Sequence, residues 1–188
     1  MTTVPDGSRV YTRAPVRDDR EEFTELMRLS REFHSPWATA PTDDDRFAAY
    51  LADARRADFE AMLLCRSEDE AILGFFNLSQ IVRRRLQSAY LGYAVGAPFA
   101  GAGYMREGIE LVLHHCFTRL ELHRVEANIQ PGNHNSLALA RGAGFRREGF
   151  SPRYLKIGGR WRDHERWAIL VEDWRGRTGA PARPDGPF

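Results

Sequence analysis

The sequence predicts an α+β fold, built as one domain around a mixed β-sheet. Apolar patterns of period two and period 3.6 follow one another in the order strand, two helices, three strands, helix, strand, helix, two strands. The 188 residues suit one domain with a substantial core, and 43% apolar and 11% aromatic residues are ordinary for a globular protein. No repeat or linker divides the chain.

The first elements are a strand and a helical hairpin. We expect the strand over residues 8–14. The acidic pair Asp18 and Asp19 precedes a helical apolar pattern. Asp43 is a good N-cap for a second helix, and Trp37 lies in the bend between the two helices. A tryptophan in such a bend is more often a packing residue than a functional one, although these loops often line pockets.

Three strands are expected next. Residues 59–66 and 71–81 are apolar runs separated by a charged turn, which predicts an antiparallel hairpin. The triple arginine at 83–85 ends this hairpin and favours a solvated turn over an RNA-facing patch. Residues 89–95 form the third strand.

That third strand enters a glycine-rich turn that opens directly into an amphipathic helix. The turn contains Gly96, Gly101 and Gly103. Apolar residues recur on one face of the helix at Met105, Ile109, Val112, Cys116 and Leu120, and polar residues take the other face at Glu107, Glu110 and His114. We therefore expect one buried and one solvated helix face.

The helix start has the properties of a phosphate site. Its first backbone N–H groups lack helical partners and lie at the positive end of the helix dipole. A Cβ at Gly101 or Gly103 would hinder close approach of a ligand to the main chain. A tight strand-to-helix connection explains the loop equally well. The loop lacks the Gly-Lys-Ser/Thr ending and the G-x-G-x-x-G spacing, so ATP and NAD are disfavoured.

The C-terminal third contains a strand, a capped helix and a hairpin. Residues 123–130 alternate, with Val125, Ala127 and Ile129 on one face and Arg124, Glu126 and Asn128 on the other. Asn133 caps a helix that runs to Gly142. Residues 150–157 and 161–171 are strands joined at Gly158 and Gly159. Residues 175–188, with three prolines and three glycines, are expected to be a disordered tail, which leaves 8–174 as the domain.

Composition narrows the class of protein. Basic and acidic residues number 27 and 26, so no overall field attracts nucleic acid or an anionic membrane. Cys65 and Cys116 are too few for a disulfide framework or a zinc cluster, and the scattered histidines suggest no metal. No signal peptide, membrane-spanning run or G-x-S-x-G hydrolase elbow is visible, so we expect a cytoplasmic protein.

Read together, the loop, the capped helix and the final hairpin resemble the GNAT superfamily of acetyl-CoA-dependent N-acetyltransferases. The family's loop pattern is Gln/Arg-x-x-Gly-x-Gly/Ala, and the window here is AGAGYM at 100–105. Gly103 matches, whereas Ala100 and Met105 depart from the pattern. Several stretches resemble the enzymes that acetylate the N-terminal alanine or serine of ribosomal proteins: PW at 36–37, YLGYAVG at 90–96, HRVEANIQPGNHNS at 123–136, GFRREGF at 144–150 and YLKIGGRWRDH at 154–164.

The resemblance implies a fold and a cosubstrate. The fourth and fifth strands would splay apart, and the pantetheine of acetyl-CoA would fill the gap as a pseudo-strand. The pyrophosphate would be held by the loop residues Ala100, Gly101, Ala102, Gly103, Tyr104 and Met105. The N–H near Val95 would meet the acetyl oxygen, and Asn133 would touch the pantetheine. No metal is implied.

The resemblance also suggests catalytic groups. An α-amino group has a reference pKa near 8, so a base is needed at neutral pH. Glu126 is the candidate base, although it could equally pair with Arg124 or Arg146. Many family members carry a tyrosine acid where this chain has Ala140, so Ser136 is assigned as the acid that protonates the coenzyme A thiolate. Tyr154 is the reserve candidate.

The acceptor implied by the resemblance is the N-terminal amine of a protein, such as a ribosomal protein. Acetylation of a small amine such as a polyamine, an aminoglycoside or an amino-acid analogue is the alternative within the same fold. The second alternative is a non-catalytic domain that binds acetyl-CoA, RNA or a protein. Relatives of this type often form homodimers, and the sequence leaves the oligomeric state open.

Overall fold

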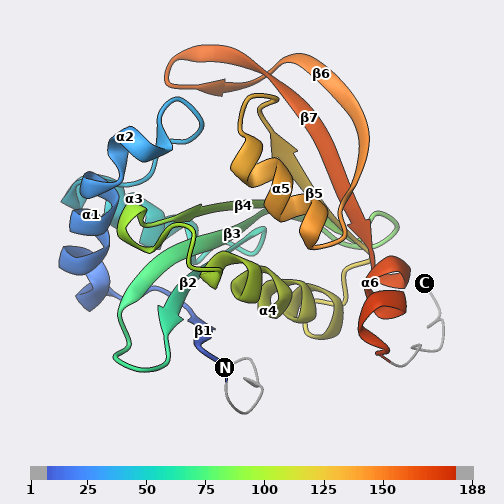
Figure 1. The fold of residues 1–188 in the computed structure, drawn as a ribbon, viewed down its shortest axis with the longest axis horizontal. Coiled ribbons are helices and arrows are strands. Elements are labelled where there is room, and N and C mark those ends of the chain that lie inside the picture. Colours follow the sequence, from blue (N-terminus) through green and yellow to red (C-terminus); the bar gives the residue numbers. More distant parts are fainter. Residues whose placement is uncertain (1–7, 181–188) are drawn as a thin grey trace.

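A seven-stranded mixed sheet organises the chain (Figure 1) in the computed structural model, which describes residues 8–180. Its strands lie in the order β1-β2-β3-β4-β5-β7-β6. Their bounds are β1 Val10–Arg13, β2 Phe59–Arg66, β3 Ile72–Val82, β4 Ser88–Val95, β5 Arg124–Ile129, β6 Arg146–Ile157 and β7 Arg160–Leu170. The predicted α+β class is confirmed, and the seven strands occur along the chain in the predicted alternation with helices.

The described part of the chain also contains six α-helices and two short 3₁₀ turns, of which α6 follows the last strand and the others lie between strands. The helices are α1 Arg20–Leu29, α2 Arg31–His34, α3 Asp44–Asp53, α4 Tyr104–Thr118, α5 His134–Gly142 and α6 Val171–Thr178, and the turns are η1 Arg17–Asp19 and η2 Ala97–Phe99. The expected caps are present. The Asp43 side chain accepts a hydrogen bond from Arg46 N, and the Asn133 side chain accepts one from Ser136 N.

Helices cover both faces of the sheet, which gives two apolar cores. Helices α4, α5 and α6 pack with residues of one face, and α1 and α3 pack with residues of the other. Helix α4 lies very close to the sheet at Gly108, where an added Cβ would come within 2.8 Å of the Leu64 and Phe76 side chains. More of α4 is buried than one face, because Leu111, Leu113 and Phe117 are also in the core.

The sheet opens between β4 and β5. These two strands form its parallel pair, and the pairing covers Ser88 with Arg124, Ala89 with Val125 and Tyr90 with Glu126. No pairing with β5 continues along β4 from Leu91 to Val95 within the described residues, although this stretch stays paired with β3 on its other side. The expected splay between the fourth and fifth strands is confirmed. Along this stretch of β4, the edge that faces β5 therefore has no strand of the described residues paired with it, and this edge lies beside the cavity described below.

The C-terminal end of the chain differs from the sequence-based expectation. Helix α6, which the sequence analysis missed, continues through Thr178, so the boundary at residue 174 falls inside a helix and the expected tail does not begin at residue 175. Arg177 holds this helix in place by donating to Glu110 of α4 and to the Ala143 carbonyl. The rest of the expected tail, residues 181–188, lies outside the described part of the chain.

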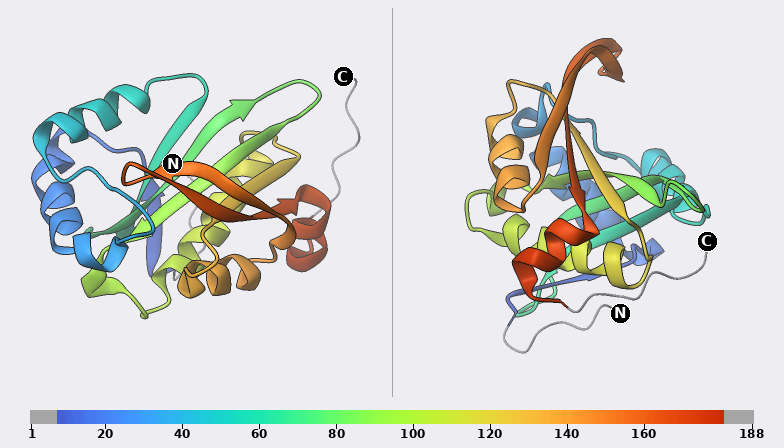
Figure 2. Two further views of the ribbon diagram at one scale, coloured as in Figure 1. Left: turned by 90° about the horizontal axis from the view of Figure 1, so that it is seen from above. Right: turned by 90° about the vertical axis from the view of Figure 1, so that its right-hand side faces the viewer.

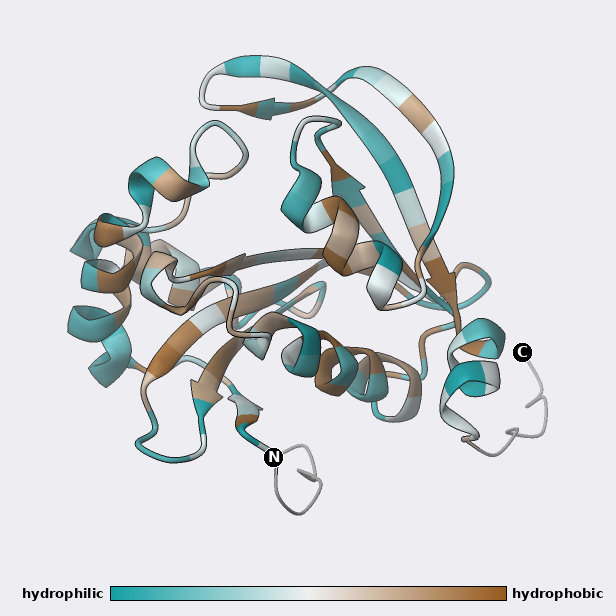
Figure 3. Cartoon of the chain, in the orientation of Figure 1, coloured by the Kyte–Doolittle hydropathy of each residue, from teal (hydrophilic) through white to brown (hydrophobic). Residues whose placement is uncertain are grey.

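The β6–β7 hairpin projects beyond the body of the fold (Figure 2). It is largely hydrophilic, whereas the central strands are mostly hydrophobic (Figure 3). Strand β6 begins at Arg146, four residues earlier than expected, and two register shifts interrupt its pairing with β7. The hairpin is therefore longer and less regular than the sequence predicted.

Candidate active site

The glycine-rich loop presents a row of unpaired backbone donors. Within the described residues, the N–H groups of residues 101–105 make no backbone hydrogen bond, and no side chain caps the start of α4. Gly101 and Gly103 have φ angles of 79° and 85°, in the region that favours glycine. Five successive unpaired donors at the positive end of a 15-residue helix suit a phosphate group.

These donors border a cavity of about 420 Å³. It lies where β4 ends, between the glycine-rich loop, helix α5 and the segment after α2. Eight of the residues predicted from the sequence line it: Val95, Ala100, Gly101, Gly103, Tyr104, Met105, Asn133 and Ser136. The prediction therefore brought together residues from three separate elements. Ala102 does not line the cavity, and its carbonyl accepts a hydrogen bond from Arg9 on the far side of the loop.

Helices α1 and α2 tether the start of the loop. His34 Nε2 donates to the Val95 carbonyl at 2.8 Å, which fixes the proton on that nitrogen. The Ser30 hydroxyl accepts from Ala97 N at 2.8 Å and donates to the Leu26 carbonyl. His34 and Ser30 are both buried. The end of β4 is thus held by hydrogen bonds from the first helical hairpin.

Ser136 is placed on the α5 side of the cavity. Its backbone N–H donates to the Asn133 side chain at 3.2 Å, and its carbonyl accepts from the Tyr93 hydroxyl at 3.2 Å. The Ser136 side chain is also within hydrogen-bonding reach of Tyr93. Burial raises the pKa of Tyr93 to about 12, so this tyrosine stays protonated and acts as a donor.

Trp37 packs on the turn between β5 and α5 at the end of the cavity away from the glycine-rich loop. A Cβ at Gly132 would come within 2.9 Å of the Trp37 ring, and the Gln130 side chain donates to the Trp37 carbonyl at 2.9 Å. Trp37 also lines the cavity together with Phe33 and His34. It therefore combines the expected packing role with a position on the cavity wall.

Glu126 and Tyr154 lie outside this cavity. Val125 and Ala127 point into the core beneath α4 and α5, so Glu126 between them lies on the opposite face of β5. Its carboxylate accepts from Arg124 Nε at 2.9 Å, which is one of the two pairings expected for it. Tyr154 contacts Tyr90, and this contact together with burial raises the pKa of Tyr90 to about 12.

These residues gather at the point where β4 and β5 separate, because Tyr90 and Glu126 form the last paired position. Two residues further along the same face of β5, Asn128 has a buried Oδ1 without a hydrogen-bond partner among the described residues. Buried polar atoms are normally hydrogen-bonded, so an unpaired acceptor at this point suits a donor brought by a ligand.

A larger cavity of about 1130 Å³ lies elsewhere, between β1, α3 and the end of α4. None of the predicted site residues lines it. It has neither the glycine-rich loop nor the splayed strands, so its size does not make it the better candidate for the reaction.

His34 and Tyr93 line the cavity and Arg9 contacts the loop beside it, and none of the three was predicted as a site residue. The sequence signal for His34 was a helix break, and Tyr93 appeared as an ordinary strand residue. Arg9 is 93 residues from Ala102, whose carbonyl it contacts. Such contacts depend on which elements pack together in the folded chain, so the sequence pattern does not show them. The bend at Trp37, a kind of loop that often lines pockets, does lie at the cavity.

Comparisons with known proteins agree with this geometry. The model of the acetyltransferase (GNAT) domain matches residues 9–146. The probable N-acetyltransferase YjcK of Bacillus subtilis is 31% identical over 89% of this chain and 97% of its own length. The [ribosomal protein uS5]-alanine N-acetyltransferase of Escherichia coli is 36% identical over 57% of this chain and 55% of its own length. The structure of Mycobacterium smegmatis RimJ in complex with CoA-disulfide superposes with a TM-score of 0.78 at 28% identity, covering 87% of this chain and 82% of that one.

Proposed function

The chain belongs to the acetyltransferase (GNAT) domain family and is an N-acetyltransferase, and on this premise we propose that it transfers acetyl from acetyl-CoA to the N-terminal α-amino group of a protein in the cytoplasm. The observation that carries the proposal is the cavity that joins the glycine-rich loop to the Trp37 segment. One end of it suits a pyrophosphate and the other suits a neutral chain with one amine.

Acetyl-CoA is the proposed cosubstrate because the residues present fit it. The five unpaired N–H groups at 101–105 would hold the pyrophosphate, and the unpaired edge of β4 from Leu91 to Val95 would take the pantetheine amides. Bound there, acetyl-CoA supplies an activated acyl group. Because the loop acts through its backbone, the alanine at position 100 removes a side-chain contact and leaves these donors in place.

The charge of the acceptor end favours a monoamine over a polyamine. The described residues that line the cavity include no aspartate or glutamate, so Glu126, which lies outside it, is the one carboxylate that the proposal gives to the amine. A polyamine carries several positive charges, and burying these without carboxylate partners is costly. A protein N-terminus brings one amine, which loses its proton before transfer, followed by neutral peptide groups. Phe33 and Trp37 provide apolar walls for such a chain.

Proton transfers are assigned to groups on the two sides of the splay. We propose Ser136 on the coenzyme side as the donor to the departing thiolate. On the other face of the sheet, Glu126 takes the proton of the incoming amine, directly or through water, while the unpaired Asn128 Oδ1 orients that amine. Tyr154 is the second candidate for the donor.

Initial rates with an acceptor panel test the proposal. Peptides beginning with alanine or serine are expected to be acetylated with higher kcat/KM than spermidine or kanamycin. The same peptides with a blocked N-terminus serve as matched controls and should be inactive. A higher kcat/KM for spermidine would place the enzyme in the small-amine class, and no transfer to any amine by a protein that binds acetyl-CoA would indicate a non-catalytic domain.

A further inference from the structure

We propose that Arg9, just before β1, is a positioning residue that holds the glycine-rich loop in its coenzyme-binding conformation. This inference rests on the proposed function, because it assigns a support to the same coenzyme site. It concerns the far side of the loop, opposite the cavity. Arg9 does not line the cavity, so the role is an indirect one.

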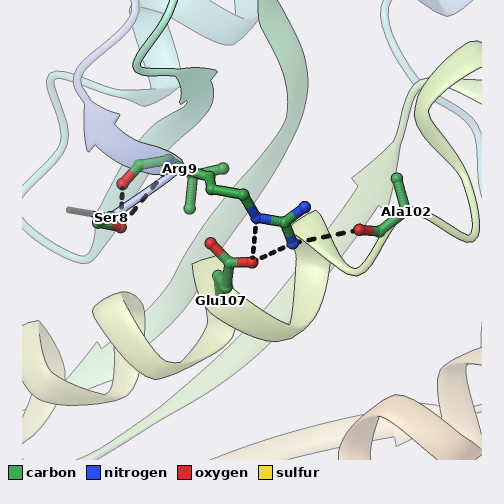
Figure 4. A network of polar contacts seen from close by, with 5 residues as sticks. Ser8, Arg9, Ala102 and Glu107 are labelled. Atoms are coloured by element: carbon green, nitrogen blue, oxygen red, sulfur yellow. Dashed lines mark hydrogen bonds and ion pairs between the residues drawn. The ribbon is translucent and has the colours of Figure 1, made fainter.

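Arg9 donates three hydrogen bonds to the loop and the first turn of α4 (Figure 4), and its guanidinium also packs on Tyr104. Its Nε donates to Glu107 Oε1 at 2.8 Å, and its terminal nitrogen donates to the same carboxylate oxygen. That terminal nitrogen also donates to the Ala102 carbonyl at 3.2 Å. The guanidinium carbon lies 4.9 Å from the centre of the Tyr104 ring. One side chain therefore contacts Ala102, Tyr104 and Glu107, which lie in the loop and in the first turn of α4.

The backbone of Arg9 is itself fixed to the sheet. Its carbonyl accepts from Ser67 N at 2.9 Å, and the following Val10 pairs with Arg66 of β2. The guanidinium is thus anchored on a strand that does not belong to the loop. Contact between β1 and α4 brings the two together across 98 residues of sequence.

The contact with Ala102 controls which way a backbone donor points. In a trans peptide the C=O and the following N–H point in opposite directions. Because Arg9 holds the Ala102 carbonyl on the far side of the loop, the Gly103 N–H points away from Arg9. Gly103 has a φ of 85°, and the loop on either side of it is rich in small residues, so the peptide has little else to keep it from turning.

This support also explains how the loop functions with Ala100 at the place where family members usually carry Gln or Arg. A methyl group at that position provides no hydrogen bond. Within the described residues the start of α4 has no side-chain cap either. Arg9 contacts the same loop from a different element, so the loop is stabilised without a polar side chain at position 100.

The test compares coenzyme A affinity in two matched variants. Arg9→Met removes the donors and keeps most of the aliphatic stem over Tyr104. Arg20→Ala is the control, because Arg20 is another half-exposed arginine paired with a carboxylate, Asp44, on the α1–α3 side. Calorimetry should show a roughly tenfold higher Kd for coenzyme A in Arg9→Met. This magnitude is the lower end of the range for losing hydrogen bonds from a charged donor, because the site is half-exposed. Arg20→Ala should bind as the wild type does.

Two further readouts separate positioning from other roles. With saturating acetyl-CoA the kcat of Arg9→Met should match the wild type, since Arg9 touches no reacting atom, while the KM for acetyl-CoA rises. The affinity loss should persist with dephospho-CoA, which retains the pyrophosphate and lacks the 3′-phosphate. A loss that disappears with dephospho-CoA would overturn the positioning role, because Arg9 would then contact the 3′-phosphate directly.

The experiment also distinguishes this inference from the proposed function. Wild-type protein that fails to bind coenzyme A would contradict the proposed function itself. Wild-type protein that binds coenzyme A with the same Kd as a folded Arg9→Met variant would overturn the role of Arg9 alone.

Discussion

Substitution of Gly103 is the most informative perturbation of the coenzyme site. Gly103→Val places a β-branched side chain at a φ of 85°, and its Cβ would lie 3.4 Å from the Arg9 guanidinium. Backbone strain of this kind costs about 1 to 3 kcal/mol. The variant can keep the conformation and lose that much stability, or it can relieve the strain by turning the peptide.

Either response weakens coenzyme binding. A kept conformation puts the valine side chain against Arg9 and disturbs the contact that orients the Gly103 N–H, and a turned peptide removes the Gly103 N–H from the row of donors. We expect the Kd for coenzyme A to rise at least tenfold, which corresponds to about 1.4 kcal/mol of binding free energy. Calorimetry of coenzyme A binding measures this, and thermal unfolding in the same buffer verifies that the variant is folded.

Gly159→Val is the matched control. Gly159 has a φ of 79° in the β6–β7 turn, and an added Cβ there would meet no atom within 4 Å. It should lose similar stability and retain wild-type affinity for coenzyme A. A folded Gly103→Val variant with unchanged Kd would refute the assignment of the loop, and so would an equal loss of affinity in Gly159→Val.

Three further predictions concern catalysis and the core. Ser136→Ala should lower kcat by about a hundredfold, the low end for general acid catalysis, with unchanged acetyl-CoA affinity in calorimetry; full kcat when chemistry limits the rate would move the acid to Tyr154. Glu126→Gln should lower kcat/KM at pH 7 and recover as the pH passes the amine pKa near 8, where the free amine no longer needs a base; a pH profile parallel to the wild type would contradict this role. Burial raises the pKa of the Cys65 thiol to about 11 and also raises the pKa of the Cys116 thiol, so neither forms much thiolate at pH 8. A thiol reagent should therefore label both cysteines only after the protein is unfolded. Rapid labelling of the native protein would contradict their placement in the core.

Much of the fold followed from local pattern. Strand alternation in residues 124–129 and the caps at Asp43 and Asn133 depend on neighbours a few residues away, which is why they could be predicted. Helix α6 could not. It contains Gly176 and is mostly polar, and what holds it is the burial of Val171 and Trp174 and the long-range contacts of Arg177. Tertiary packing there overrides weak helix propensity.

The site was predicted unevenly for a related reason. The loop and Asn133 carry a backbone signature, in positive φ and helix capping, that a sequence reveals. His34 and Arg9 each donate to a backbone carbonyl far away in the sequence, and a contact of this kind produces no pattern in the sequence. Ser136 was predicted as the acid and Glu126 as the base, and the structure places Ser136 on the cavity wall and Glu126 on the opposite face of β5.

The position of the transferred acetyl group tests the central claim most directly. A synthetic peptide beginning with alanine and carrying one internal lysine is incubated with the enzyme and acetyl-CoA, and the product is fragmented by mass spectrometry. The proposed function predicts one acetyl group, on the α-amino nitrogen of the alanine. Acetyl on the lysine side chain, or an unmodified peptide under conditions where spermidine is acetylated, would contradict it.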